Sequence, residues 1–285
     1  MGTLVAAWIE RDVVACSGPD AATFLQGQLS QDVVGIAVGA SRWSLVLQPQ
    51  GKVESFVRVS RVAEAEFLLD VEAGHGAAML TRLQRFKLRV DCQFETVDGW
   101  RCLAIRALDD DGGAALDSLD TSSAAIVAPV DWPLTPGVDL LGPAVEVPSG
   151  VALDGGPKRA FERLRIRAGI PRLGAELDES TIPAEAGQWL IDHSVSFTKG
   201  CFVGQELVAR VDSRGSNTPR KLRLLRIAHG VTTVGAEVMA GGEVVGAVTS
   251  VANLDALAFL RRSVEVGDAV TVGGEPATVE ALPAG

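Results

Sequence analysis

The sequence predicts an α+β fold with mostly antiparallel sheets and a small closed β-barrel at its C-terminal end. Helical patterns alternate with hairpin-like pairs of strands, without the regular strand–helix–strand crossovers of a parallel sheet. After Pro219, short strand patterns separated by glycine turns follow one another closely, which is typical of a small barrel. The length of 285 residues suits two or three modest domains with a sizeable core.

The N-terminal region predicts strands and two helices. Residues 4–16 predict a strand over 13–16 with its approach, and Pro19 and Asp20 then suit the first turn of a helix. A second helix is predicted over 74–86. Residues 48–52 carry the turn signal of a hairpin. The predicted strands of this region cover 43–47, 53–59, 67–71, 102–106 and 125–130.

The middle of the chain predicts connections and one more helix. Residues 109–123 are acidic and small, which favours a surface loop or an internal boundary, and residues 129–157 are rich in proline and glycine. A helix over 160–168 is ended by Gly169 and Pro171. Barrel strands are predicted over 222–227, 237–239, 241–251, 256–259, 269–272 and 277–282. The expected regions are an N-terminal α+β region (1–130), a linker and α+β region (131–215) and the C-terminal β-barrel (219–285).

Charge and hydropathy argue against some classes of protein. The net charge of −10 disfavours nucleic-acid binding, which needs a basic face. No apolar run reaches the roughly 18 residues of a membrane span, and residues 1–4 do not begin a signal peptide. A cytoplasmic protein that does not contact membranes is therefore expected. Cations cluster over 158–172 and 210–226, and each cluster is either a solvated face or a rim for an anionic ligand.

The four cysteines are widely spread. Cys16, Cys92, Cys102 and Cys201 form no C-x-x-C pair, so neither a zinc knuckle nor a self-contained iron–sulfur site is indicated. In a cytoplasmic protein, free thiols are expected rather than disulfides. A metal site built by this chain alone is not expected.

The stretch from Lys199 to Arg210 carries the strongest chemical signal. It reads Lys-Gly-Cys-Phe-Val-Gly-Gln-Glu-Leu-Val-Ala-Arg, with a helix predicted from about Gly204. Cys201 then lies in the turn before that helix, where free N–H groups and the helix dipole favour a thiolate. Lys199 would act in the same direction if it folds over the turn. The alternative is a small cysteine that only packs in the core.

This stretch resembles the signature of the YgfZ-type folate-binding proteins, which are relatives of the glycine-cleavage T-protein (aminomethyltransferase). Phe202 stands where that family often has tyrosine. The resemblance extends over nearly the whole chain, through segments 24–32, 50–53 and 246–268. It implies two interleaved α+β domains and a β-barrel around a central cavity for tetrahydrofolate or a derivative. It also implies a role in the assembly or repair of iron–sulfur enzymes, with tRNA-modifying enzymes among the candidates.

Two departures set the chain apart from the T-protein. Arg167 stands where the T-protein has the glutamate that holds the pterin donor edge, and arginine offers donors only. No aspartate matches the catalytic aspartate of the T-protein, although Asp70 and Glu72 lie nearby in the sequence. A folate-dependent one-carbon transferase is therefore the alternative hypothesis rather than the leading one. A scaffold with this fold and no chemistry is a third hypothesis.

The resemblance implies a candidate site centred on Cys201. Its thiol would be a nucleophile, a redox group or one ligand of a cluster shared with a partner, and Lys199 and Arg210 would lower its pKa. The partners implied are a reduced folate and iron–sulfur assembly proteins or client enzymes. The residues expected to bind the ligand are Gln205, Glu206, Gly204, Phe202, Trp189, Glu185 and Arg167.

Overall fold

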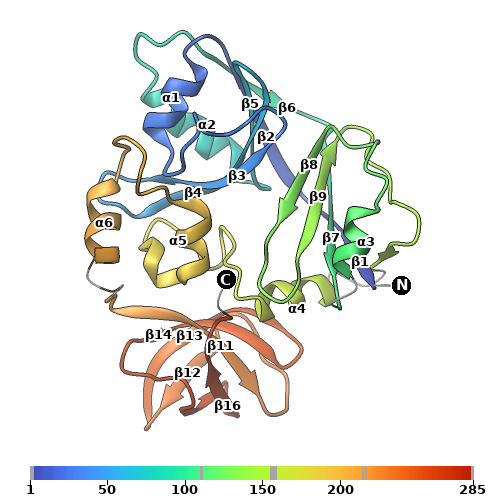
Figure 1. Ribbon diagram of the computed structural model, residues 1–285. Helices are drawn as coiled ribbons and strands as arrows, with labels where there is room; N and C mark the ends of the chain where they lie inside the picture. Colours follow the sequence, from blue (N-terminus) through green and yellow to red (C-terminus); the bar gives the residue numbers. More distant parts are fainter. Residues whose placement is uncertain (1–2, 110–111, 155–158, 214, 216, 284–285) are drawn as a thin grey trace.

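Two five-stranded sheets and a closed six-stranded barrel make up the fold (Figure 1). The computed structural model describes residues 3–109, 112–154, 159–213, 215 and 217–283. Within these ranges, no helix is long and apolar enough to cross a membrane. The α+β class with mostly antiparallel sheets and a C-terminal barrel, expected from the sequence, is confirmed.

The first sheet has the strand order β3-β4-β5-β2-β6, and all its neighbours are antiparallel. Helices α1 (Ala21–Gln28) and α2 (Gly76–Arg85) pack against it through Phe24, Leu25 and Leu83. The hairpin predicted over 48–52 joins its first two strands. The strands are β2 (Arg11–Ser17), β3 (Ser41–Leu47), β4 (Val53–Ala63), β5 (Glu66–Glu72) and β6 (Gln93–Val97).

The second sheet has the order β10-β1-β7-β9-β8, and only the β1–β10 pair is parallel. Its strands are β1 (Leu4–Ile9), β7 (Arg101–Ala107), β8 (Ile126–Val130), β9 (Gly137–Gly142) and β10 (Ala152–Leu153). The strand expected over 13–16 is confirmed as part of β2, but its expected approach contains a separate strand, β1, because the chain leaves one sheet and enters the other at Glu10. The loop expected over 109–123 also contains a short helix, α3 (Gly112–Asp117).

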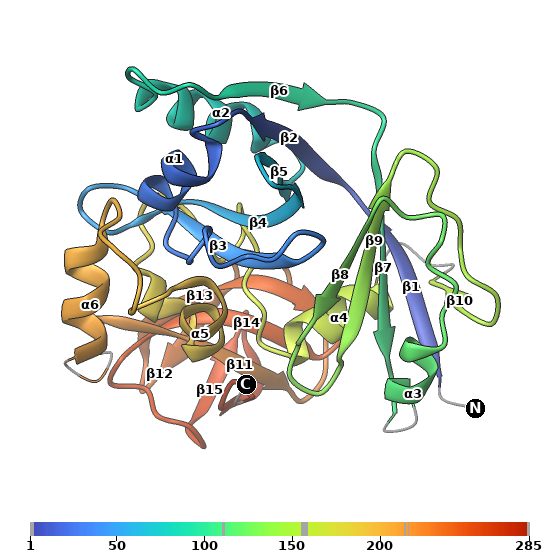
Figure 2. The ribbon, with the colours of Figure 1, turned by 45° about the horizontal axis from the view of Figure 1, so that its top comes forward.

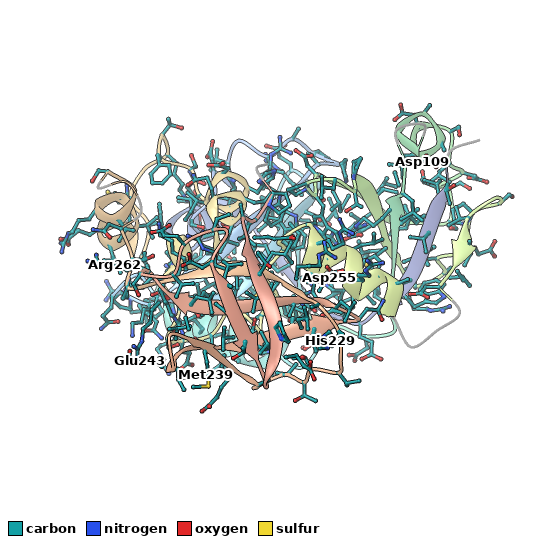
Figure 3. All side chains as sticks on the ribbon, turned by 90° about the horizontal axis from the view of Figure 1, so that it is seen from below. Asp109, His229, Met239, Glu243, Asp255 and Arg262 are labelled. Carbon is teal, nitrogen blue, oxygen red and sulfur yellow. The ribbon has the colours of Figure 1, made fainter. Side chains whose placement is uncertain are left out.

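The barrel closes in the order β11-β14-β13-β12-β15-β16. Its interior is filled by aliphatic side chains such as Leu225, Val238 and Val272. In Figure 3, Asp255 lies where the barrel meets the helix that follows the second sheet, and it accepts a hydrogen bond from Arg163 of that helix at 2.7 Å. The strands are β11 (Arg220–Ile227), β12 (Glu237–Ala240), β13 (Glu243–Ala252), β14 (Asp255–Arg261), β15 (Ala269–Val272) and β16 (Glu275–Glu280).

Helices from the middle of the chain lie between the two sheets and the barrel (Figures 1 and 2). Their buried side chains, among them Phe161, Trp189 and Val208, join one core cluster with residues of β3, β4, β11 and β14. The cluster also includes Ala7 and Ala104 of the second sheet, so it connects all three parts of the fold. The helices are α4 (Arg159–Arg167), the 3-10 turn η1 (Pro183–Ala186), α5 (Gln188–Ser194) and α6 (Gln205–Ser213).

Candidate functional site

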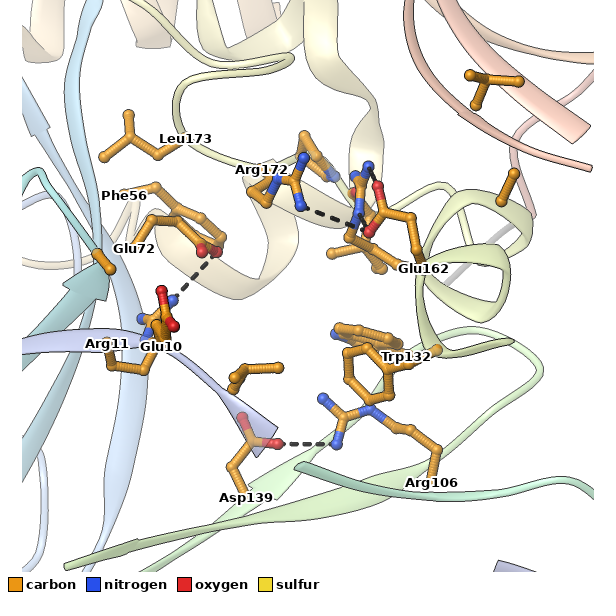
Figure 4. Close-up of a pocket in the computed structure, with 18 of the residues that line it drawn as sticks. Glu10, Arg11, Phe56, Glu72, Arg106, Trp132, Asp139, Glu162, Arg172 and Leu173 are labelled. Atoms are coloured by element: carbon orange, nitrogen blue, oxygen red, sulfur yellow. Dashed lines mark hydrogen bonds and ion pairs between the residues drawn. The ribbon is translucent and has the colours of Figure 1, made fainter. Parts of the chain in front are cut away.

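A cavity of about 890 Å³ lies where the two sheets, α4 and the barrel loops meet (Figure 4). Both sheets contribute to its walls, and loops 230–232 and 251–254 of the barrel form part of its rim. The side chains that line it combine flat aromatic surfaces with charged groups. These are chiefly Ile9, Glu10, Arg11, Trp43, Phe56, Glu72, His75, Arg106, Trp132, Asp139, Phe161, Glu162, Arg165, Ile170, Arg172, Leu173 and Trp189.

Two pairs of aromatic rings form part of the cavity wall. Trp43 and Phe56 are stacked, with ring centroids 4.7 Å apart and an interplanar angle of 22°. Trp132 and Phe161 are 5.6 Å apart and tilted by 51°. Aromatic faces of this kind pack well against a planar ring of a ligand. The cavity is therefore suited to a molecule with an aromatic or heteroaromatic part.

A chain of buried ion pairs joins the two sheets beside the cavity. Asp70 accepts from Nε of Arg11 at 2.7 Å and from Nε of Arg58 at 3.0 Å. Asp139 accepts from Arg58 at 2.7 Å and from Arg106 at 2.8 Å. Burial alone would raise the pKa of Asp139, but Arg106 and Arg58 outweigh it and hold that pKa below its usual value. Because Arg58 belongs to β4 and Asp139 to β9, the chain of charges fixes one sheet against the other.

Glu162 of α4 presents a carboxylate to the cavity. Arg165 donates to both of its oxygens, at 3.0 and 2.7 Å, and Arg172 lies 3.5 Å away (Figure 4). Burial raises the pKa of Glu162, but the hydrogen bonds and charge of Arg165, with Arg172, outweigh burial and lower it. The carboxylate is therefore ionised at neutral pH. Its oxygens retain lone pairs, so Glu162 can still accept a hydrogen bond from a ligand.

Two donors beside the cavity have no partner. The Nε atom of Arg106 and the Nε1 atom of Trp132 are buried, and neither donates a hydrogen bond to any described residue. The Arg106 guanidinium also lies over the Trp132 ring, 4.0 Å from its centroid. A buried donor without an acceptor costs about 1–3 kcal/mol. Acceptor atoms of a bound molecule would remove this cost.

The motif loop lies apart from the cavity, against helix α1. The ammonium of Lys199 donates to the carbonyl oxygens of Gln26, Leu29 and Gln31 at 2.5, 2.7 and 2.8 Å. These carbonyls lie at and just beyond the C-terminal end of α1, where the helix dipole favours a cation. The ammonium also lies 5.2 Å from the centroid of the Phe202 ring.

The pH dependence of the unfolding free energy is expected to reflect the titration of the Lys199 ammonium. Burial lowers the pKa of Lys199 to about 8, against a smaller opposing effect of Asp32. The folded chain thus binds this proton less tightly than the unfolded chain, so the unfolding free energy should rise between pH ~8 and ~10.4. Thermal unfolding should show the Tm of the wild type increasing relative to Lys199→Met across this window, with Lys221→Met as control. A decreasing difference would mean that the carbonyl contacts raise this pKa.

The start of α6 is fixed by its own turn and by the β3–β4 hairpin. Phe202 is buried, and its N–H donates to the side-chain oxygen of Gln205 at 3.3 Å. Gly204 has φ +81°, and a Cβ there would lie 2.5 Å from the carbonyl oxygen of Gln48 and 3.1 Å from Cα of Gly51. The two glycines therefore allow the hairpin and the motif loop to touch through their backbones.

Cys201 is the exposed thiol of the chain. All four cysteines are free, and Cys16, Cys92 and Cys102 are buried. Cys201 does not line the cavity. Glu206 and Arg210 form an ion pair with each other on the exposed face of α6. The arginine expected beside the thiol is therefore engaged by the neighbouring carboxylate.

The remaining predicted residues occupy different places. Trp189 lines the cavity and donates from Nε1 to the carbonyl of Asp131 at 2.7 Å. Glu185 is buried and accepts from Arg220 of the barrel at 3.0 Å, so it ties η1 to β11. Arg167 is not among the residues that line the cavity. Of the predicted ligand residues, the structure thus brings Trp189 to the cavity, and it places the motif residues at a second location.

Several cations of the two clusters form ion pairs within the fold. Arg165 and Arg172 line the cavity. Arg163 and Arg226 pair with Asp255. Arg220 and Arg210 pair with Glu185 and Glu206 as described above, and Lys158 and Arg214 lie outside the described residues. The clusters thus contribute chiefly ion pairs, and Arg172 is the partly exposed cation they bring to the cavity.

Comparisons with known proteins agree with this arrangement. Residues 220–283 match the family model described as the CAF17 C-terminal beta-barrel domain. An uncharacterized protein of Haemophilus influenzae is 26% identical over 254 residues, covering 87% of this chain and 84% of that protein. An aminomethyltransferase of Streptomyces coelicolor is 26% identical, covering 83% of this chain and 71% of that enzyme.

A third relative is a mitochondrial iron–sulfur cluster assembly factor IBA57 homolog of Pyricularia oryzae. It is 28% identical over 77% of this chain, and the alignment covers 56% of the fungal protein. The chain thus spans little more than half the length of this relative. The crystal structure of the glycine cleavage system aminomethyltransferase T of Bartonella henselae superposes with a TM-score of 0.74 and 19% identity, covering 99% of this chain and 86% of that one. The chain therefore has the aminomethyltransferase fold with a CAF17-type C-terminal barrel, and it is a homologue of the IBA57-type proteins and the aminomethyltransferases, which agrees with the expected relationship to the T-protein.

Proposed function

We propose that this protein binds a reduced folate in the central cavity and supports the assembly or repair of iron–sulfur clusters through Cys201. The observation that carries the proposal is the pairing of two separate features in one chain. One is a cavity with aromatic walls and an oriented carboxylate, and the other is an exposed thiol on a tightly held loop. Relatives named as iron–sulfur cluster assembly factors support the pathway, and relatives named as aminomethyltransferases support the ligand.

The residues of the cavity fit a reduced folate. Its pterin ring would pack against Trp43 or Trp132, and its 2-amino and N3–H donors need an acceptor such as Glu162. The unpartnered donors of Trp132 and Arg106 suit the acceptor atoms of the same ring. Arg172 is 42% exposed and suits the terminal carboxylates. When bound, a reduced folate carries one-carbon units, and the residues of this chain would bind and orient it.

Glu162→Gln is expected to weaken tetrahydrofolate binding by about 10- to 100-fold, because a hydrogen bond to a charged group is lost. Titration calorimetry on the wild type and the variant measures this effect, and thermal unfolding shows whether the variant keeps its fold. Glu243→Gln is the matched control, since Glu243 is exposed on the barrel and does not line the cavity. No binding by the wild type would contradict the folate proposal and favour a scaffold without a ligand.

Cys201→Ala is expected to abolish rescue of iron–sulfur enzyme activity in a deletion strain, while Cys201→Ser keeps its tetrahydrofolate affinity within about twofold. The reason is that the thiol is exposed and separate from the cavity. It would act on a partner, either as a nucleophile or redox group, or as one thiolate ligand of a cluster that the partner carries. Activity of iron–sulfur enzymes in cell extracts, tRNA-modifying ones included, is the readout, and Thr198→Ala in the same loop is the control. Equal rescue by Cys201→Ala would remove the thiol from the function.

A one-carbon transferase is the second candidate function, because aminomethyltransferases are among the relatives. Glu72 ends β5, where the sequence provides no matching aspartate, and it lines the cavity. Its carboxylate pairs with Arg11 at 3.1 Å, which disfavours a free base at this point. Formation of methylene-tetrahydrofolate from an S-aminomethyl thiol donor, with release of ammonia and the free thiol, in proportion to enzyme and lost in Glu72→Gln, would favour the transferase.

A further inference from the structure

A seam of hydrogen bonds joins the loop that carries Cys201 to the end of α1. The N–H of Ser196 donates to the carbonyl of Ser30 at 2.9 Å, and the hydroxyl of Ser30 donates to the carbonyl of Ser194 at 2.6 Å. The side chain of Gln31 donates to the carbonyl of His193 at 3.1 Å. These contacts join segments that are more than 150 residues apart, so the loop is held by the N-terminal part of the fold.

Lys199 completes this seam with three donors. An ammonium group has three N–H bonds, and those of Lys199 are matched by the carbonyl oxygens of Gln26, Leu29 and Gln31. Hydrogen bonds from a charged donor are stronger than neutral ones. They satisfy carbonyls at and beyond the end of α1, a place where a helix leaves acceptors without partners. Lys199 is therefore saturated by backbone, and it has no N–H left for a thiolate.

The rest of the loop is fixed on the other side of the cysteine. Phe202 is buried beneath the Lys199 ammonium, and Gly204 touches the β3–β4 hairpin. Cys201 lies between these two anchors, and it is exposed. Lys199, Phe202 and Gly204 thus hold the backbone of the loop on both sides of Cys201, while the thiol itself is exposed.

We infer that Lys199 is a positioning residue, which pins the loop to the C-terminal end of α1 so that Cys201 is presented to a partner in one conformation. Its ammonium does not activate the thiol through a hydrogen bond, because its three N–H groups are donated to backbone carbonyls. This inference rests on the proposed role of Cys201. Its test is nevertheless separate, because it needs neither folate nor an iron–sulfur enzyme.

The experiment compares wild type, Lys199→Met and Lys199→Arg. Hydrogen exchange follows the amides of Ser196, Phe202 and Val203, with the amides of β11 as an internal control. Alkylation by iodoacetamide between pH 6 and 10 follows the thiol, since the other three cysteines are buried, and Cys201→Ser gives the background. Methionine removes both charge and donors, whereas arginine keeps the charge but cannot direct a compact set of donors to the three carbonyls.

Both variants are expected to speed exchange of the loop amides by about tenfold or more, through loss of charge-assisted hydrogen bonds. The midpoint of the alkylation profile should stay within about 0.3 pH units of the wild type in both, because no N–H of the Lys199 ammonium is donated to the thiolate. A midpoint raised by about one unit or more in Lys199→Met alone would overturn the inference. So would unchanged exchange in both variants. If Lys199→Met does not fold, the exchange of Lys199→Arg decides the test. Unchanged exchange of the loop amides in Lys199→Arg would then overturn the inference.

Discussion

Replacing Asp70 by asparagine is expected to lower the free energy of unfolding by about 3–5 kcal/mol, because two buried guanidinium groups lose the carboxylate that they share, and each keeps one other carboxylate, Glu72 for Arg11 and Asp139 for Arg58. Arg11 and Arg58 both donate to this carboxylate, and the side chains of Arg58 and Asp70 are 1% and 2% exposed. Asparagine has almost the same volume as aspartate, so no cavity contributes to the loss. Urea unfolding followed by circular dichroism measures the change as a lower midpoint with an unchanged m-value.

The matched control is an exposed ion pair of the same protein. Arg261 and Glu243 are 3.5 Å apart with side chains that are 61% and 78% exposed. Glu243→Gln should change the unfolding free energy by no more than about 0.5 kcal/mol, since solvent screens such a pair. Similar small losses for Asp70→Asn and Glu243→Gln would contradict the view that buried charges hold the two sheets together.

The barrel and the fold class could be predicted from the sequence because their signals are local. Glycine turns and alternating strands between 219 and 285 fix the strand pattern of the barrel, and hairpin turns fix the antiparallel neighbours. The approach to the strand predicted over 13–16, which holds the separate strand β1, is a different case. The charged run 10–12 separates two apolar stretches, but such a run alone does not tell whether the strands on its two sides belong to one sheet or to two. That change is what interleaves the two α+β parts.

The cavity could be predicted much less well, because its charged residues find their partners across the fold. Arg58 and Asp139 are 81 positions apart in the sequence, and their contact depends on how two sheets pack. The sequence does contain a signal, namely an arginine or aspartate at an inward position of a strand, as at Arg58, Asp70 and Arg106. Glu162 could not be distinguished from any other exposed-looking helical glutamate before Arg165 and Arg172 were seen beside it.

The structure of the motif could be predicted in part. The helix predicted from about Gly204 begins at Gln205, and the turn before it carries an exposed cysteine. The partners of Lys199 could not be predicted, because they are backbone carbonyls some 170 residues earlier. A lysine two positions before a cysteine suggests an electrostatic effect on the thiol, and only the tertiary contact with α1 shows where the ammonium lies.

Replacing Gly204 by alanine is expected to lower the free energy of unfolding by about 2–5 kcal/mol, the sum of backbone strain and overpacking. The residue has φ +81°, which disfavours any side chain. Its new Cβ would also lie 2.5 Å from the carbonyl oxygen of Gln48 and 2.8 Å from Cβ of Leu47. The positions of both atoms are set by the backbone of the hairpin, so relief requires movement of the β3–β4 hairpin or of the loop.

Gly200 provides the control within the same loop. A Cβ at Gly200 would meet no atom within 4 Å, and its φ is not in the left-handed region. Gly200→Ala should therefore be neutral or stabilise the fold by up to about 1 kcal/mol, because alanine restricts the unfolded chain. Thermal unfolding of the two variants side by side measures the contrast. Equal Tm values would show that the hairpin and the motif loop are not held together at Gly204.

Gly204→Ala and Gly200→Ala also distinguish an effect on the stability of the fold from an effect on the position of the Cys201 thiol. If the hairpin moves to accommodate the added methyl group of Gly204→Ala, the contact with the motif loop is lost while the seam with α1 remains, and the alkylation rate of Cys201 should change little. If the loop moves instead, Cys201 shifts together with Phe202, and the rate should change along with the Tm. Lys199 and Gly204 lie on opposite sides of the thiol and hold it against different elements. A change in the alkylation rate that exceeds the change produced by Gly200→Ala would therefore show that both anchors are needed to present one thiol in one place.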